Sequence, residues 1–415
     1  MATSDAPTDE KARAEPAGPL DGLRVIDAGV IFAGPLVGTL LADLGADVVK
    51  IEHPKGDDVR KTGMFKDGEG LWWRVTARNK QSLALDMGKP EGQRIAKQLI
   101  ARADVLIENF RAGRFAAWGM DYRTLAADNP GLVLLHISGY GQTGPYSERP
   151  CLGTLAEAFS GFAITNGEAD GPPILPSFPI ADGVAAMVGA YSILAALWRR
   201  ERNGGVGEEI DVSLYEPLLS LLGSMVIDYD QLGYVAMRHG NRSNWSVPRN
   251  AYKTSDDKWI AISGAANNVT VRLFRAIERD DLADDPGLAT NPQRVKRMDE
   301  CDGAIADWIG RHTQDEVMAR FRAYDVVAGP ICDIAQLFAD PHVQQRTFRE
   351  LDDPALGKVR VQEVVPRFTN TPATMRWLGR RKVGADTESV LEGLGYDAEA
   401  IAELEGRGVV RRAEE

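Results

Sequence analysis

The stretch from Leu23 to Glu52 reads LRVIDAGVIFAGPLVGTLLADLGADVVKIE, and it decides the fold class. Its two ends, Leu23–Asp27 and Ala46–Glu52, have the apolar composition of buried parallel strands. Between them, Gly29–Pro35 is predicted as a turn, because its closing proline suits the first turn of a helix that runs through Leu44. A strand, a helix and a second strand in this order predict a βαβ unit.

The same alternation continues through the first half of the chain. Because parallel neighbours need helical crossovers, it predicts an α/β fold whose mostly parallel sheet is covered on both faces. Further strands are predicted at Ser82–Leu85, Asp104–Glu108, Leu132–Ser138 and Glu209–Ser213, and helices at Glu91–Arg102, Tyr122–Asp128, Phe178–Trp198 and about Tyr215–Tyr229, with a polar loop at Arg199–Gly207.

At 415 residues the chain exceeds the usual size of one hydrophobic core, so a second, smaller α/β domain is expected. Gly240–Pro248 is predicted as an irregular crossover and Lys258–Ser263 as the strand that opens the small domain. Val326–Pro330 is expected to return to the large domain. The remaining helices are predicted at Thr270–Glu278, Arg297–Gly310, Glu388–Leu394 and Asp397–Glu405.

These elements predict a disordered lead at residues 1–18, a large domain at 19–225 and 330–415, and a small domain with crossover linkers at 226–329. The lead is rich in Ala, Pro and acidic residues without an apolar stretch, so it is not expected to be a signal peptide. The longest apolar run, Val184–Trp198, is short for a membrane span, and a buried helix is expected there.

Composition limits the classes of partner. The net charge of −12 argues against nucleic-acid binding but leaves room for a small anionic ligand in a local basic pocket. The three cysteines are far apart and odd in number, which fits a reducing, cytoplasmic location. The five histidines have no partner at metal-ligand spacing, so no metal site is expected.

The first βαβ unit raises the possibility of a dinucleotide site, since Glu52 ends the second strand where a ribose-binding acid would lie. Its glycines contradict that interpretation, because Gly29, Gly34 and Gly38 do not form a G-x-G-x-x-G pattern. Glu52 is therefore expected to end its strand at the surface.

The sharpest catalytic candidate is Asp182, which stands in FPIADGVAAMVG at Phe178–Gly189, the start of a neutral, small-residue helix. A carboxylate there is either a helix cap or a nucleophile, and position alone favours the cap. Gly183 leaves space beside the carboxylate, and the positive end of the helix would stabilise an anion or an oxyanion. The stiff loop Asp170–Pro173 could hold it in place.

Other candidates are weaker. Arg111 follows the carboxyl end of a strand and offers a planar fork for phosphate, and Lys80 is a second cation just before a strand. A single arginine or lysine in such a position is more often a solvent-exposed charge than a ligand-binding residue. The glycine-rich loop Ser138–Tyr146 either admits a ligand or is a simple turn. Cys151 has no nearby histidine in sequence to activate it, so a packing role is expected.

Taken in order along the chain, these blocks resemble the family III CoA-transferases, the carnitine- and formyl-CoA-transferase-related group, which also contains α-methylacyl-CoA racemases. The resemblance covers nearly everything after about Pro19. The blocks that carry it are Leu20–Asp27, Ala33–Pro35, Leu44–Glu52, Arg78–Lys80, Glu108–Gly113, Gly139–Gly141, Asp170–Pro173, Val212–Leu214 and Thr387–Tyr396.

The resemblance implies a Rossmann-like large domain with a parallel sheet, a smaller α/β domain, and an interlocked homodimer. It implies that Asp182 is the catalytic nucleophile and that a CoA thioester is the substrate, with no permanently bound cofactor. The CoA-binding residues that it implies are Val30, Ile31, Phe32, Ala33, His53, Asn79, Lys80, Asn109, Arg111 and Tyr140.

Departures from the family pattern narrow the activity. The racemases add a histidine–aspartate pair, and their histidine would fall near Leu152, where this chain has no base. Formyl-CoA transferases carry a polar amide near Phe32, so oxalate and formate are poorer candidates here. His53 stands where many relatives have arginine.

The resulting hypothesis is transfer of CoA between an acyl-CoA and a carboxylic acid through a covalent aspartyl intermediate, within or between molecules. Two alternatives stay open: an acyl-CoA racemase or epimerase, and a non-catalytic CoA-thioester-binding protein in which Asp182 is only a cap. The identity of the acids is not encoded in any motif.

Overall fold

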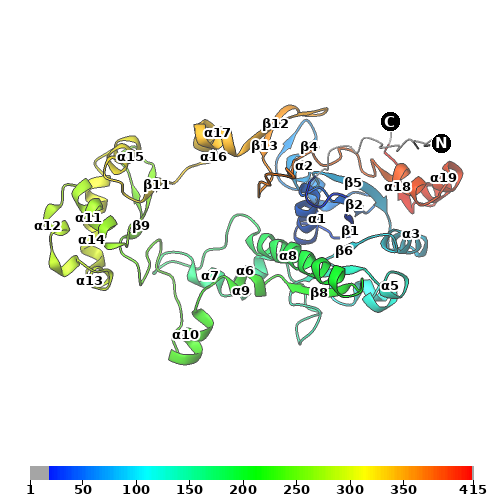
Figure 1. Ribbon diagram of the computed structural model, residues 1–415, viewed down its shortest axis with the longest axis horizontal. Coiled ribbons are helices and arrows are strands. Elements are labelled where there is room, and N and C mark those ends of the chain that lie inside the picture. The colour runs from blue at the N-terminus through cyan, green and yellow to red at the C-terminus, as the bar shows by residue number, and fades with distance from the viewer. Residues whose placement is uncertain (1–17, 414–415) are drawn as a thin grey trace, which may run out of the picture. The chain divides into compact units, whose positions relative to one another are not determined.

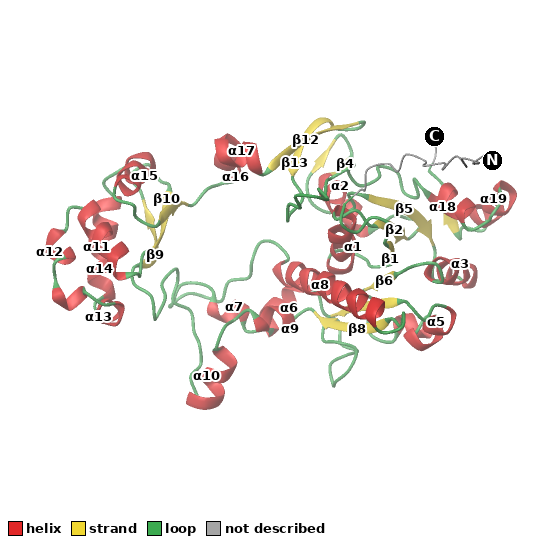
Figure 2. Cartoon of the chain, viewed as in Figure 1, coloured by secondary structure: helices red, strands yellow, loops and turns green. Residues whose placement is uncertain are grey.

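A computed structural model describes residues 18–413 and divides them into two compact units, shown in Figures 1 and 2. The large unit comprises residues up to Gly161, Pro176–Gly223, and the chain from Phe348 onward. The small unit comprises Phe162–Leu175 and Ser224–Thr347. These bounds differ from the expected 226–329, while the expected lead lies outside the described residues except for Gly18, which is buried.

The large unit is built on a seven-stranded sheet in the order β14-β5-β2-β1-β6-β7-β8. All neighbours are parallel except β14, which pairs antiparallel with β5 at one edge. The prediction of a mostly parallel α/β sheet is therefore confirmed. Its strands are β1 (Arg24–Asp27), β2 (Asp47–Glu52), β5 (Lys80–Leu85), β6 (Val105–Glu108), β7 (Val133–Ser138), β8 (Glu208–Ser213) and β14 (Val410–Arg411).

The order of strands defines where a ligand would bind. The chain builds outward from β1 to β2 and β5 on one side, then returns to β6 and continues to β7 and β8 on the other. The reversal therefore lies between β1 and β6. In open α/β sheets, ligands bind outside the carboxyl ends of the strands at this point.

Helices cover both faces of the sheet. Leu134 and Leu135 are successive residues of β7 and therefore point to opposite faces. Leu134 belongs to an apolar cluster that also contains residues of α3, α5, α18 and α19. A Cβ added to Gly189 of α8 would lie 2.8 Å from Leu135 and 3.3 Å from Val37 of α1, so α1 and α8 meet on the other face. These helices are α1 (Ala33–Asp43), α3 (Pro90–Ile100), α5 (Tyr122–Asp128), α8 (Ile180–Arg202), α18 (Thr387–Gly393) and α19 (Ala398–Gly406).

Helix α8 is longer than expected, continuing past Trp198 to Arg202 because the polar residues after Trp198 extend the last turn. It is 23 residues long with a mean hydropathy of 1.7 over its most apolar window, of which 39% is buried. Within residues 18–413 it alone has the length and composition of a membrane span, a test that core helices of soluble proteins also pass.

The predicted helix at Tyr215–Tyr229 is wrong in one respect, because the chain forms two helices there. Gly223, which lies between them, adopts a φ of 68°, a left-handed conformation that interrupts a continuous helix and that glycine accepts without strain. The first, α9 (Glu216–Ser220), belongs to the large unit, and the second, α10 (Met225–Leu232), to the small one.

The small unit contains an antiparallel sheet of β9 (Arg249–Lys253), β10 (Trp259–Ser263) and β11 (Ala328–Pro330). Strand β11 pairs with β10, Ile262 lying opposite Ala328, so Val326–Pro330 does not return to the large unit as expected. The hydrogen bonds of this third strand keep it in the small sheet. The helices here are α7 (Phe162–Thr165), α11 (Asn267–Ala276), α12 (Asp280–Ala283), α13 (Asn291–Lys296), α14 (Met298–Ile309), α15 (Gln314–Ala323), α16 (Ile334–Ala339), α17 (Pro341–Arg346) and the 3₁₀ turn η2 (Pro286–Leu288).

Short elements complete the large unit. A hairpin of β12 and β13 brings the chain back from the small unit, and it has its own apolar cluster around Met375 and Leu378. The short elements are η1 (Asp58–Lys61), β3 (Phe65–Lys66), β4 (Glu69–Gly70), α2 (Leu71–Thr76), α4 (Arg114–Ala117), α6 (Gly153–Phe159), β12 (Phe348–Asp353) and β13 (Gly357–Gln362).

Candidate active site

The candidate site lies at the carboxyl edge of the sheet, where the loops after β1 and β6 meet. Asn109, the first residue after β6, binds the backbone of Val30 in the loop after β1. Its Oδ1 accepts the Val30 N–H at 2.7 Å, and its Nδ2 donates to the Val30 carbonyl at 2.9 Å. Asn109 therefore joins the two predicted ligand loops at the point where the strand order reverses.

Two buried charged side chains, Asp27 and Lys50, bind the backbone of the loop after β1. The Gly29 N–H donates to Asp27 Oδ1 at 3.0 Å, and the ammonium of Lys50 donates to the Gly29 carbonyl. Farther along, Ile31 has a φ of 63°. A left-handed conformation is costly for a β-branched residue and persists only where surrounding contacts enforce it. The loop is thus held in one strained conformation that ends at Ala33, the first residue of α1.

Asp182 lies in the first turn of α8, and its carboxylate faces that loop. The N-cap of α8 is Pro179, and no side chain of the cap residue bonds the helix. The backbone N–H groups of Ala33 and of Asp182 itself lower the pKa of the Asp182 carboxyl. Since the N-cap of α8 is Pro179, Asp182 is not the N-cap of its own helix.

The electrostatic surroundings of Asp182 favour a basic carboxylate. Burial raises its pKa from the usual 3.8 to about 6, and the carboxylate of Glu157 acts in the same direction. The two backbone N–H groups lower the pKa, but by less. Within the described chain, no cationic nitrogen lies within 4.0 Å of Asp182. A carboxylate without a cation in a partly buried site is a candidate for function.

Glycines make room for this carboxylate. A Cβ on Gly153 would lie 1.9 Å from Asp182 Oδ2, so only glycine fits at the start of α6. A Cβ on Gly183 would meet nothing within 4 Å. The space expected beside Gly183 is therefore present, and the second glycine, Gly153, is a feature that sequence reasoning did not find.

Sequence reasoning also missed Glu157. It stands in α6, is only 2% exposed, and its Oε1 accepts the N–H of Ala181 at 3.3 Å. A signal was present, because Glu157 is a single acid in the otherwise uncharged stretch Cys151–Gly167. What it faces depends on the packing of α6 against α8, which no local pattern reveals.

Cys151 and Tyr140 lie on another side of Asp182. The phenol of Tyr140 lowers the pKa of the Cys151 thiol, and the charge of Asp182 raises it. Burial raises the pKa of the Cys151 thiol, with Asp182 contributing in the same direction, so the thiol stays protonated at neutral pH. Tyr140 packs edge-on against Tyr146 and Phe159, so its ring belongs to an aromatic cluster beside the site.

A pocket of about 220 Å³ opens beside these residues. Arg111 and Arg149 are among its lining residues, and the Arg149 guanidinium lies 3.6 Å from the centroid of the Tyr146 ring. The hydroxyl of Ser138, another lining residue, is buried without a hydrogen-bond partner in the described chain. Arginine side chains at a pocket suit a carboxylate or a phosphate. The lining residues are Asn109, Phe110, Arg111, Ser138, Gly139, Ser147, Arg149, Pro150, Cys151 and Leu152.

The sequence profile of CoA-transferase family III matches residues 20–387. This chain belongs to CoA-transferase family III. The family resemblance inferred from the sequence blocks is therefore confirmed, and Asp182 and the loop after β1 lie within the matched range.

Relatives of this family III chain agree with that assignment. It is 37% identical to a succinyl-CoA–D-citramalate CoA-transferase of Chloroflexus aurantiacus, over 95% of this chain and 99% of the relative. It is 35% identical to a succinate–glutarate CoA-transferase of Agrobacterium fabrum, over 80% of this chain and 84% of the relative. The crystal structure of a CaiB/BaiF family protein from Brucella suis matches with a TM-score of 0.81 and 30% identity, covering 91% of this chain and all of that one.

Two residues that were expected to contact CoA in this family III chain, Lys80 and Asn79, are buried and bonded to other residues. The Lys80 ammonium is 1% exposed and pairs with Asp27 Oδ2 at 2.8 Å. Asn79 is also buried, and its side chain bonds Asp43 and the backbone N–H of Arg376. Both lie at the start of β5, the end of the strand opposite the site, so neither is free to bind a phosphate here.

The remaining expected residues lie at the carboxyl edge, and all of them except the buried Ala33 are at least partly exposed. His53 follows β2, its side chain is about half exposed, and its Nδ1 accepts the Lys55 N–H at 3.1 Å. Phe32 packs against Trp72 with ring centroids 5.5 Å apart. Glu52, expected at the surface, is instead buried and paired with Arg60 at 2.7 Å, because η1 folds back over the strand end.

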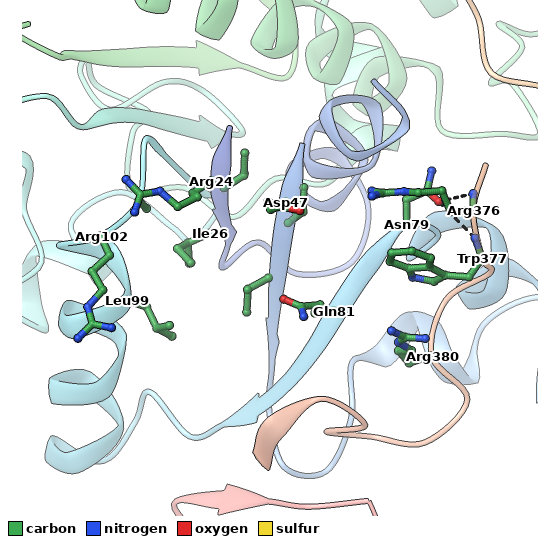
Figure 3. A pocket seen from close by; sticks show the side chains of 14 residues that line it. Arg24, Ile26, Asp47, Asn79, Gln81, Leu99, Arg102, Arg376, Trp377 and Arg380 are labelled. Atoms are coloured by element: carbon green, nitrogen blue, oxygen red, sulfur yellow. Dashed lines mark hydrogen bonds between the residues drawn. The ribbon is translucent and has the colours of Figure 1, made fainter. Parts of the chain in front are cut away.

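The family III chain has a larger cavity of about 490 Å³ at the amino ends of β1, β2 and β5, shown in Figure 3. Arg102 and Arg376 line it, and their guanidiniums already face helix carboxyl ends. Arg102 donates to the Gly393 carbonyl of α18, and Arg376 lies 3.5 Å from the Ala42 carbonyl of α1. Cations at these positions offset the dipoles of α18 and α1.

No group of three or more His, Cys, Asp or Glu side chains with metal-binding geometry is found in residues 18–413.

Proposed function

We propose that this protein transfers CoA between an acyl-CoA thioester and a carboxylic acid, with Asp182 as the covalent nucleophile. The observation that carries the proposal is the carboxylate itself. It lies in the first turn of α8 without a cation, its pKa is raised to about 6, and it faces a backbone N–H of the strained loop end. A nucleophile needs this combination of basicity and fixed orientation.

The chemistry divides into two exchanges. An Asp182 oxygen attacks the thioester carbonyl, the carbon–sulfur bond breaks, and an acyl-aspartyl anhydride and CoA thiolate form. The thiolate attacks the aspartyl carbonyl and releases the donor acid, which leaves an aspartyl-CoA thioester. The acceptor carboxylate repeats these two steps in reverse and leaves with CoA, so no net proton is exchanged.

The chain provides stabilising groups for these steps. The backbone N–H of Ala33 lowers the pKa of the Asp182 carboxyl, so it favours negative charge where charge grows each time the aspartyl carbonyl is attacked. The dipole of α8 acts in the same direction. Cys151 and Tyr140 stay protonated at neutral pH, so they add no competing charge.

We propose dicarboxylic acids as the substrate class. The two relatives are named for succinate, citramalate and glutarate, all of which carry two carboxyl groups. The pocket with Arg111, Arg149 and Ser138 offers polar groups to a second carboxylate. The wall formed by Phe32 and Trp72 is apolar and suits the carbon chain between them. Val30, Ile31, Ala33, His53, Asn109, Arg111 and Tyr140 remain the proposed contacts for CoA itself.

We also propose an interlocked homodimer, as the family resemblance implies, in a reducing cytoplasm. Helix α8 exposes Met187, Tyr191 and Trp198 by about 60% each, at helical spacing on one side. An apolar stripe of this kind suits a protein partner. A monomeric mass in light scattering would contradict the dimer.

A donor–acceptor screen tests the function. Succinyl-CoA is combined with citramalate, glutarate and monocarboxylates, and new CoA esters are identified by mass spectrometry. Hydroxylamine or borohydride added during turnover should modify Asp182, located by peptide analysis. Asp182→Ala should lose transfer, while Asp170→Asn, which changes an exposed acid of the preceding loop, should retain it. An active Asp182→Ala variant would refute the nucleophile.

A further inference from the structure

Glu157 is a buried acid whose position the proposed chemistry does not yet use. It lies in α6 one turn after Gly153, the glycine that makes room for Asp182. Its carboxylate is 2% exposed and accepts the N–H of Ala181, the residue before Asp182. Glu157 therefore reaches the start of α8 from a different helix.

This contact answers why Asp182 is not the cap of α8. The first backbone N–H groups of a helix have no partner within it and need an acceptor. Pro179, at the N-cap, provides none. Glu157 supplies one for Ala181, the second residue of α8, so this N–H does not need the Asp182 carboxylate.

Glu157 and Asp182 differ from other buried acids of the large unit because they lack a cationic partner within the described chain. Other buried acids have cationic partners: Glu52 pairs with Arg60 and Asp43 with Arg78. Across residues 18–413, neither Glu157 nor Asp182 has a Lys, Arg or His nitrogen within 4.0 Å. Two carboxylates kept together without a cation oppose each other's ionisation, a cost that persists where function needs it.

We propose that Glu157 is the positioning residue of the nucleophile: it accepts the Ala181 N–H at the start of α8 in place of Asp182, and it sets a negative charge beside the Asp182 carboxylate. The inference rests on the proposed function, because it explains how a weak nucleophile is activated. Glu157 touches no substrate, so its effect passes through Asp182.

The titratable groups around Asp182 are few. Glu157 faces it from α6 and the Cys151 thiol from the loop before α6, while α1 contributes the Ala33 N–H. The thiol stays protonated at neutral pH. Glu157 is therefore the charged neighbour whose removal should change Asp182.

Two substitutions separate its roles. Glu157→Gln keeps an acceptor for Ala181 but removes the charge, so the acid limb of acyl transfer should move to lower pH and kcat should fall several-fold. The KM for acyl-CoA should stay within about twofold, since binding is not altered. Glu157→Ala also removes the acceptor, and turnover should fall on the order of 10- to 100-fold as Asp182 loses its orientation.

The control is Asp121→Asn. Asp121 caps α5 by accepting the Thr124 N–H at 3.0 Å, so this variant loses a capping charge away from Asp182. It should leave the pH profile unchanged. A Glu157→Gln profile that superimposes on that of the wild type would overturn the proposal.

A second measurement does not depend on turnover. The Asp182 carboxyl carbon is titrated by ¹³C NMR, with its signal assigned by comparison with Asp182→Asn. A lower pKa in Glu157→Gln than in the wild type supports the proposal, and an equal pKa overturns it. Absence of an Asp182 adduct in the wild type would instead contradict the proposed function, whichever way the titration falls.

Discussion

Two acids, Asp27 and Asp182, hold the same loop from its two ends, yet their surroundings differ. Asp27 accepts the N–H of Gly29, is fully buried, and pairs with the ammonium of Lys80 at 2.8 Å. Asp182 is partly buried, and its charged neighbour is the carboxylate of Glu157 instead of a cation. The negative charge of Asp27 is therefore neutralised by Lys80, whereas the charge of Asp182 has no cation beside it in the described chain.

The difference shows how a structural acid and a reactive acid can be told apart. A buried carboxylate with a hydrogen-bonded cation is stable but a poor nucleophile, because its charge is already satisfied. A carboxylate with only backbone donors keeps its basicity at a cost to stability. Burial is the larger cause of the raised pKa of Asp182, and the sign of the neighbouring charge adds to the contrast, since it is positive beside Asp27 and negative beside Asp182.

The largest effect should come from Asp182→Asn, which removes the nucleophile and keeps the shape. We expect transfer to fall on the order of 10³-fold or more, as for other covalent nucleophiles. Succinyl-CoA turnover and adduct trapping measure this. Retention of even a tenth of the activity would place Asp182 among the structural acids.

Asp27→Asn should have the next largest effect, and on stability. It leaves the Lys80 ammonium buried without its counter-ion, which typically costs about 3–5 kcal/mol. Burial already lowers the pKa of Lys80, so part of the loss should be recovered by its deprotonation at alkaline pH. Urea unfolding at pH 7 and pH 10 measures both. Wild-type stability in this variant would remove the contrast between the two acids.

Asp182→Asn should also change the pH dependence of unfolding. The folded pKa of about 6 lies above the unfolded value near 3.8, so ionisation of Asp182 lowers stability as pH rises through this interval. Removing the group should therefore stabilise the fold above pH 6 and have no effect near pH 3. After allowance for solvent at this partly exposed site, we expect a gain of about 1–2 kcal/mol at pH 8. Chemical unfolding at both pH values tests the sign.

The smallest effect should come from Ile31→Gly. Glycine adopts the φ of 63° without strain, which stabilises the folded state, but its greater conformational freedom stabilises the unfolded chain. Because the two effects oppose each other, the free energy of unfolding should change by less than about 1 kcal/mol. The loop should become less rigid, and the KM for acyl-CoA should rise. Kinetics with Val30→Gly, which relieves no strain, provide the comparison. Equal KM values for both variants would show that the strain is unimportant.

Local pattern was sufficient for much of the fold. The strands around Ile26 and Val48 and the helix between them follow from residue composition and short-range periodicity, and Asp182 was evident as a single acid in a small-residue helix. Pattern was insufficient where a left-handed residue divided a predicted helix, as at Gly223, and where a strand paired with a partner distant in sequence, as β11 does.

By itself, the sequence determined the βαβ alternation, the parallel sheet, the family, and the carboxyl edge as the ligand edge, because these depend on neighbours along the chain. Tertiary structure decided which charges are free. Lys80 is directed to Asp27, and Glu157 is brought to Asp182, through contacts between elements that no local pattern encodes. The free energy of a charge depends on what surrounds it in space, and only the packed fold sets those surroundings.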